Sequence, residues 1–158
     1  MLAERFSRGV FIDADDLDRF IVSGRAPITP PISPDAELQL RLRASHEAML
    51  ADLYFGAGFN VVIAEFVLGD RYRQFMTEIK SRPLLLVSLV PWLDIVKKRN
   101  EERPNKNVFE PWSPILDREI RATMNGIGLW IDNSSQTVEE TVDEIIRRMR
   151  EAEIQPNP

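Results

Sequence analysis

The sequence predicts an α/β fold in which helices cover both faces of a parallel sheet and so form three layers. Continuous apolar runs, which are typical of buried parallel strands, occur near residues 9–14, 60–66, 83–90 and 128–133. Stretches with helix-capping residues and helical spacing of apolar side chains lie between these runs. The alternation predicts a single domain over residues 1–154, followed by a tail at residues 155–158.

The first half contains the clearer local signals. The strand that ends at Ile12 is followed by acids, and residues 24–34 hold four prolines, which predict a loop. Ser33 before a proline predicts a helix start, and the helix should stop near Gly56. This helix carries apolar side chains along one side, namely Leu38, Leu42, Met49 and Leu53. Residues 61–64 form the next predicted strand, before a helix capped by Asp70.

The second half repeats the alternation of strands and helices. The run at residues 84–90 predicts a strand, and a helix should lead from Leu93 towards Arg103. Residues 104–114 are polar and contain prolines, which predicts a loop before a short helix at 117–123. After the strand at 129–131, residues 137–140 fit a capping box that opens a final helix. Its predicted apolar stripe consists of Val138, Val142, Ile145, Ile146 and Met149.

Composition excludes several classes of function. The formal net charge of −5 argues against a nucleic-acid-binding protein, since phosphate backbones require a concentrated basic face. The chain has no cysteine, which excludes disulfides and thiolate metal sites. No apolar run approaches the length of a membrane span, and Glu4 and Arg5 stand where a signal peptide would be apolar. The expectation is a soluble, cytoplasmic protein with neither nucleic-acid nor membrane partners.

A phosphate-binding loop is absent from the sequence. Such a loop has the pattern G-x-x-x-x-G-K-[ST], in which glycine amides, the lysine and the hydroxyl hold the phosphates and Mg²⁺. None of the seven glycines is followed by lysine. The opening residues 1–6 are instead similar to the end of the helix that would follow such a loop, so the missing strand and loop are expected before Met1.

Four groups of residues carry a resemblance to a known family. These groups are residues 11–17 (FIDADDL), residues 62–69 (VIAEFVLG), Arg99 with Arg103, and residues 131–134 (IDNS). They resemble the chloramphenicol phosphotransferase-like and tunicamycin-resistance-like group of P-loop kinases, occur in that family's order and span nearly the whole chain. The resemblance implies a five-stranded parallel sheet, ATP and Mg²⁺ at the strand ends, and a small hydroxylated acceptor, such as an antibiotic, beside them.

The resemblance implies a catalytic base after the first strand. In such kinases an aspartate at this position accepts the proton of the acceptor hydroxyl, and the matching residue is Asp15, with Asp16 as its neighbour in the acceptor site. The alternative is that one of these acids caps the helix that begins near Asp16.

The family's lid and nucleotide residues match positions in the second half. The resemblance implies that Arg99 stabilises charge on the transferred phosphoryl group and that Arg103, Asp132 and Ser134 lie at the nucleotide. The alternatives are a solvated helix surface for Arg103, beside Glu101 and Glu102, and ordinary turn chemistry for residues 132–135.

Further predictions concern the metal and the acceptor. Glu65 matches an acid that the family uses near the metal, although the adjacent family acid is Ala64 here. Arg25 lies in the proline-rich loop where acceptor specificity is built in the family, and Trp112 is placed to close over a ligand. A surface loop and an aromatic anchor are the alternative interpretations of these two residues.

Two other functions compete with the kinase interpretation. Asp13-x-Asp15 after an apolar strand is also similar to the haloacid-dehalogenase phosphatases, in which Ser88 and Lys97 or Lys98 would bind phosphate and Asp132 the metal. The second alternative is a non-catalytic binding remnant. The family's first strand is central in the sheet, between the strands that match residues 61–64 and 84–90, so its absence predicts either direct pairing of those two strands or self-association through exposed sheet edges.

Overall fold

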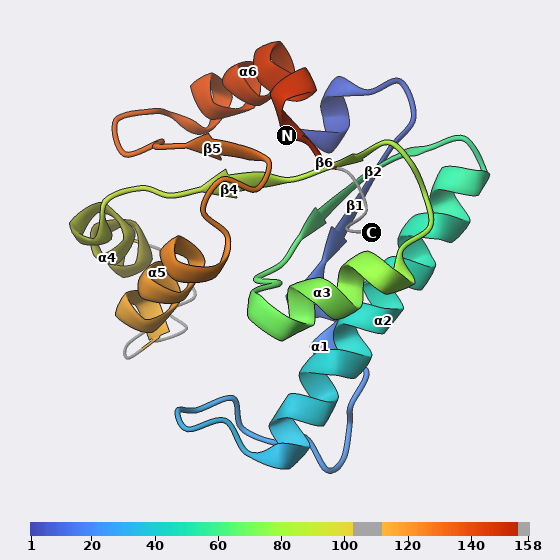
Figure 1. Cartoon of the computed structure of the whole chain (residues 1–158), viewed down its shortest axis with the longest axis vertical. Coiled ribbons are helices and arrows are strands. Elements are labelled where there is room, and N and C mark those ends of the chain that lie inside the picture. Colours follow the sequence, from blue (N-terminus) through green and yellow to red (C-terminus); the bar gives the residue numbers. More distant parts are fainter. Residues whose placement is uncertain (103–111, 155–158) are drawn as a thin grey trace. The chain divides into compact units, whose positions relative to one another are not determined.

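The computed structural model describes residues 1–102 and 112–154, and it is a mixed α/β structure, as the sequence predicts (Figure 1). The described residues form two compact units, one over residues 1–82 and the other over residues 83–154. No helix in these described ranges combines the length and the apolarity needed to cross a bilayer. The prediction of a single domain stays a prediction.

The first unit is built on one parallel strand pair. A short 3-10 helix, Ala3–Arg5, precedes β1 (Gly9–Asp13), and α1 (Ala14–Asp18) follows directly. Next come α2 (Pro34–Gly56), β2 (Asn60–Ala64) and α3 (Gly69–Glu78). β1 and β2 are parallel, with Gly9 opposite Asn60 and Asp13 opposite Ala64. The segments that follow the two strands therefore leave from the same end of the sheet, where both strands have their carboxyl ends.

Helix α2 packs against α1, β2 and α3 through a face made largely of alanine. Its start is the predicted one, because the hydroxyl of Ser33 accepts a hydrogen bond from the Ala36 N–H at 3.2 Å. The buried face consists of Ala36, Leu40, Ala44, Glu47, Ala48 and Ala51. The larger apolar side chains of the predicted stripe lie exposed on the other side. Small side chains allow the helix to approach its neighbours closely, so the alanines rather than the leucines form the contact.

The second unit contains a parallel and an antiparallel strand pair. β3 (Leu84–Leu85), β4 (Val87–Leu89), α4 (Leu93–Glu101) and α5 (Trp112–Thr123) precede β5 (Leu129–Ile131). The unit then continues with α6 (Val138–Arg148), a 3-10 helix (Met149–Ala152) and β6 (Glu153–Ile154). β4 pairs with β5 in parallel, and β3 pairs with β6 antiparallel.

The run at residues 83–90, predicted as one strand, is divided at Leu86. The Leu86 N–H donates to the Ala152 carbonyl at 2.8 Å, whereas the Leu86 carbonyl accepts from Leu129 at 2.9 Å. The chain thus changes partner at this residue, from β6 to β5. The antiparallel strand β6 was not predicted, because two residues are too few to show an alternating pattern.

The core of the second unit lies around β5 and α6. Its buried apolar residues include Met124, Leu129, Ile131, Val142, Ile145 and Ile154. The predicted capping box of α6 is confirmed, since Thr137 Oγ1 accepts from the Glu140 N–H at 3.2 Å and Glu140 accepts from the Thr137 N–H at 2.8 Å. The predicted stripe is only partly buried, because Val138 and Ile146 at its margins are exposed.

Two glycines before β5 provide a matched test of this packing. Both Gly126 and Gly128 have positive φ, at 79° and 66°, but only at Gly128 would an added Cβ lie 2.4 Å from the Leu86 carbonyl oxygen. Gly126→Ala should cost about 1 kcal/mol from backbone strain, and Gly128→Ala at least about 2 kcal/mol, because the steric clash adds to it. Urea unfolding of both variants measures the difference, and equal losses would contradict the close approach at Leu86.

Candidate functional site

Acidic side chains gather at the carboxyl ends of β1 and β2 in the first unit. Asp13 is the N-cap of α1, because its carboxylate accepts a hydrogen bond from the Asp15 N–H at 3.0 Å. The capping role therefore belongs to Asp13. Asp15 and Asp16 remain at the surface, with 75% and 66% of their side chains exposed. Asp15 is thus accessible to a ligand at this edge of the sheet.

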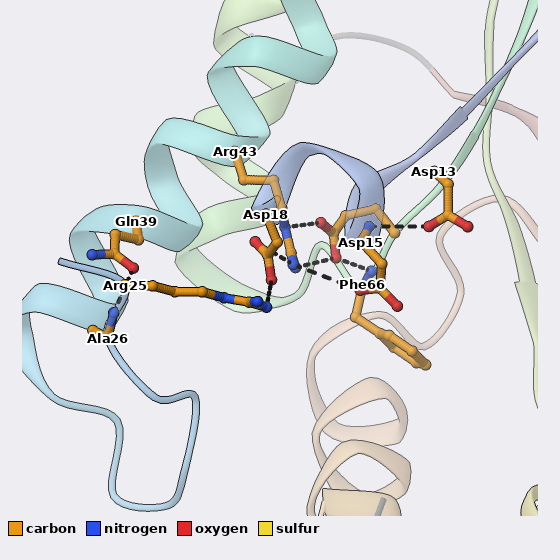
Figure 2. Close-up of polar contacts among 9 residues, drawn as sticks. Asp13, Asp15, Asp18, Arg25, Ala26, Gln39, Arg43 and Phe66 are labelled. Carbon is orange, nitrogen blue, oxygen red and sulfur yellow. Dashed lines mark hydrogen bonds and ion pairs between the residues drawn. The ribbon is translucent and has the colours of Figure 1, made fainter. Parts of the chain in front are cut away.

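Arg43 extends from α2 into this acidic group and is 12% exposed (Figure 2). Its Nη1 lies 3.2 Å from the Asp18 carboxylate and 4.0 Å from that of Asp15. Its Nε and Nη2 lie 2.7 and 2.9 Å from the two oxygens of Glu65. The guanidinium thus holds Glu65 by one hydrogen bond from Nη2 and by an ion-pair contact from Nε.

The partners of Arg43 are held from other directions as well. Asp18 is 14% exposed and also accepts a hydrogen bond from Arg25 at 3.1 Å. Glu65 is 7% exposed and accepts a second donor, the Phe66 N–H, at 2.5 Å. Burial makes these charge pairs sensitive to the loss of either partner, because water cannot reach the remaining buried charge to take the place of the lost partner.

Glu47 lies one helical turn after Arg43 and is fully buried. Its carboxyl oxygens have no N–H or O–H donor among the described residues, so the charged form is unfavourable there. The pKa of Glu47 is raised to about 9. Burial is the largest cause, and the nearby carboxyl group of Glu65 adds to it. Glu47 is therefore protonated at neutral pH, which removes the repulsion between its carboxyl group and that of Glu65.

The charge balance of the cluster follows from this protonation. Burial by itself lowers the pKa of Arg43, but the charges of Glu65 and Asp18 outweigh it, and the pKa is raised. Arg43 is consequently a permanent cation that lies between the carboxyl groups of Asp18 and Glu65. We refer to Asp18, Arg43, Glu47 and Glu65 as the Arg43 cluster.

A small hollow adjoins the cluster. It is lined by Leu40, Arg43, Ala44, Glu65, Phe66, Val67 and Arg71, and its empty space is about 180 Å³ including the open mouth. Pockets that enclose small molecules are typically larger than about 300 Å³. The hollow is therefore a recess beside the acids, too small to enclose a drug-sized ligand by itself. Within the described ranges, no group of three or more His, Asp and Glu side chains could hold a metal ion.

In the second unit, Arg99 is bound to the chain that follows β5. Its Nη2 donates to the carbonyl oxygens of Asn133 and Gln136 at 2.7 and 3.1 Å. Asp132 accepts hydrogen bonds from the N–H and hydroxyl of Ser134, which lower its pKa. The Ser134 hydroxyl accepts from the Trp92 N–H at 2.7 Å. Arg99, Asp132 and Ser134 thus belong to one hydrogen-bonded turn.

The other predicted site residues belong to neither the Arg43 cluster nor the turn after β5. Asp16 forms an exposed ion pair with Arg19 at 2.8 Å. Trp112 is the first residue of α5 and is half-buried, and Arg103 lies outside the described residues. Of the residues that the phosphatase alternative uses, Ser88 is buried in β4, whereas Lys97 and Lys98 are exposed on α4.

Sequence reasoning missed Arg43, Glu47 and Asp18. A signal was present, because Arg43 and Glu47 are four residues apart and alternate with Leu40, Ala44, Ala48 and Ala51 at helical spacing. Two charged residues on an otherwise small and apolar helix face indicate a buried polar cluster. Comparison with models of known protein families found no match, and comparison with curated protein sequences found none.

Protonation of Glu47 predicts an unusual dependence of stability on pH. Its folded pKa of about 9 lies above the ordinary value of 4.5, so the stabilisation is complete below about pH 4.5 and is lost as pH rises towards 9. Glu47→Gln should be more stable than the native chain by about 1–3 kcal/mol at pH 8 and should remove most of this slope. Urea unfolding between pH 5 and 9 measures it, and parallel profiles for the two proteins would show that Glu47 is ionised.

Removal of Arg43 should be costly, because it leaves Asp18 and Glu65 without their shared cation. Arg43→Met should lower the free energy of unfolding by about 3 kcal/mol. Arg19→Met is the matched control, since Arg19 is 76% exposed and pairs with the exposed acid Asp16, and it should cost less than about 0.5 kcal/mol. Similar losses in the two variants would mean that the cluster contributes little to stability.

Proposed function

We propose that this chain provides the acceptor-binding part of an ATP-dependent phosphotransferase that acts on a hydroxyl group of a small molecule. The proposed lineage of the chain is that of the chloramphenicol phosphotransferase-like P-loop kinases. The observation that carries the proposal is the position of Asp15. Its exposed carboxylate follows β1 and lies 4.0 Å from the guanidinium of Arg43. Ligands of parallel α/β sheets bind at the carboxyl ends of strands.

The strand pairing supports the proposed three-layer sheet. In the sheet that the resemblance implies, the family's first strand lies between the strands that match residues 61–64 and 84–90. The remaining neighbours in that sheet would be β1 with β2 and β4 with β5. Both of these pairs are parallel. A parallel pair requires a long crossover, and α1 with α2 supplies it in the first unit.

The proposed roles in the acceptor site follow from charge and exposure. Asp15 accepts the proton of the acceptor hydroxyl as that oxygen becomes the nucleophile. The resemblance implies Asp16 and Arg25 in the first unit, and Trp112 in the second, as the proposed acceptor contacts. Asp18 holds Arg25 at 3.1 Å and Arg43 at 3.2 Å, so it keeps two cations beside the base.

The sequence has no G-x-x-x-x-G-K-[ST] pattern, so the residues present do not fit a grip on the β and γ phosphates. When bound, ATP would supply the transferred phosphoryl group. Arg99 is the proposed charge-stabilising residue, and Arg103, Asp132 and Ser134 are the proposed nucleotide contacts.

The proposed metal residue is Glu65. Both of its oxygens are held by Arg43, an arrangement that does not fit direct ligation of Mg²⁺. Mg²⁺ in phosphotransferases is bound largely by substrate phosphates and water, with only one or two protein carboxylates. The proposed contribution of Glu65 is therefore to position Arg43 at the site.

A non-catalytic binding protein is the second candidate, and the absent phosphate loop favours it. Calorimetric titration with ATP separates the candidates when it is applied to two forms, the 158 residues alone and a form extended by the in-frame upstream sequence. The 158 residues should bind ATP weakly or not at all. The extended form should bind ATP if the upstream sequence encodes an apolar strand and a phosphate loop. Tight ATP binding by the 158 residues would place the nucleotide site elsewhere.

The role of Asp15 has its own test in the extended form. Asp15→Asn should lower kcat for a hydroxylated acceptor by about 100-fold or more, whereas the affinity for ATP should be nearly unchanged. Asp70→Asn is the matched control, because Asp70 is an exposed acid of the same unit that pairs with Arg73, and its kcat should equal that of the native protein. Undiminished turnover in Asp15→Asn would remove this residue from the mechanism.

A further inference from the structure

Helix α2 has a second surface that the candidate site does not use. Leu38, Leu42, Met49 and Leu53 are 58%, 48%, 66% and 69% exposed. At 3.6 residues per turn they fall within about 60° around the helix, on the side opposite the buried alanine face. We call these four residues the α2 stripe. The apolar surface that they expose is on the order of 400 Å², comparable to the largest apolar patch of a typical monomer, which is often functional.

The spacing of the α2 stripe is symmetric about a point between Ser45 and His46. Leu38 precedes this point by as many residues as Leu53 follows it, and the same holds for Leu42 and Met49. A second copy of α2 that runs antiparallel would therefore place Leu38 against Leu53 and Leu42 against Met49. A two-fold axis repeats each contact, so the surface is complementary to itself.

Charges at the two ends of α2 complement each other in the same arrangement. Asp35 lies exposed in the first turn of the helix. Arg8 lies beside Gly58, just beyond the other end, and its guanidinium stacks 4.2 Å from the ring centre of Phe59. Neither Asp35 nor Arg8 forms an ion pair within the residues that the structure describes. The antiparallel arrangement brings Asp35 of one copy to the end of α2 where Arg8 of the other lies.

We propose that the α2 stripe is a homodimer interface in which two copies of α2 pack antiparallel across a two-fold axis. The stripes of two copies would bury at most about 800 Å² in total, which is below the size of a standard specific interface, so the dimer is weak and reversible. The contact is made by helix faces and is separate from the sheet edges. It does not depend on the proposed phosphotransferase function.

Sedimentation velocity over a concentration series from about 1 µM to 1 mM tests the proposal on the full chain. The native protein should show a monomer–dimer equilibrium. Leu42→Glu and Met49→Lys should each raise the dimerisation Kd at least about tenfold, because each places a charge against an apolar side chain. Val22→Glu is the control, since Val22 is 95% exposed outside the stripe, and it should leave the Kd unchanged.

The double variant Leu42→Glu/Met49→Lys tests the direction of packing. In the antiparallel dimer the introduced glutamate faces the introduced lysine of the other copy at two places, so the Kd should return to within about threefold of the native value. Parallel packing would set like charges against each other and prevent this recovery. Circular dichroism and thermal melting verify that each variant is folded.

Three results would overturn the proposal. The first is a native chain that stays monomeric throughout the concentration range, as expected if another part of the same chain covers the stripe. The second is a dimer that the two single variants leave unchanged, as expected for association through sheet edges. The third is a double variant that does not recover.

Discussion

The buried guanidinium of Arg43 is the contact on which the first unit depends. It reaches from α2 to Asp18 at the end of α1 and to Glu65 just after β2, so it joins both strand ends of the parallel pair to the helix between them (Figure 2). Burial of these charges is tolerated because each carboxylate has a cation and Glu47 remains neutral. The cluster therefore fixes the edge of the sheet at which Asp15 is exposed.

The position of Arg43 also determines which acidic side chains at the carboxyl ends of β1 and β2 are engaged and which are exposed. The Glu65 carboxylate accepts hydrogen bonds from Arg43 and from the Phe66 N–H, an arrangement that does not fit an open metal ligand. Asp15 and Asp16 are the acids at this end of the sheet whose side chains stay largely exposed. In the second unit, Arg99 is bound to main-chain carbonyls, and it would have to leave them to reach a phosphoryl group.

The sequence predicted the positions of the helices and strands better than which side of each helix is buried. Caps at Ser33 and Thr137 and the apolar runs of β1, β2 and β5 were recognised, because these signals are local. The buried side of α2 was harder to identify, since its alanines carry little apolar surface while the exposed leucines carry more. The residues of the Arg43 cluster come from α1, α2 and the end of β2, and no local pattern shows that they meet. Strand β6 was missed because its pairing with β3 is a tertiary contact.

The most direct test of this account is the ionisation of Glu47, which can be followed by carbon-13 NMR of glutamate side-chain carboxyls across a pH titration. The account predicts that Glu47 stays protonated at pH 7 and titrates with a pKa well above its ordinary value, because it is buried against Glu65. A Glu47 carboxyl that is ionised at pH 7 with an ordinary pKa would contradict the charge balance proposed for the Arg43 cluster.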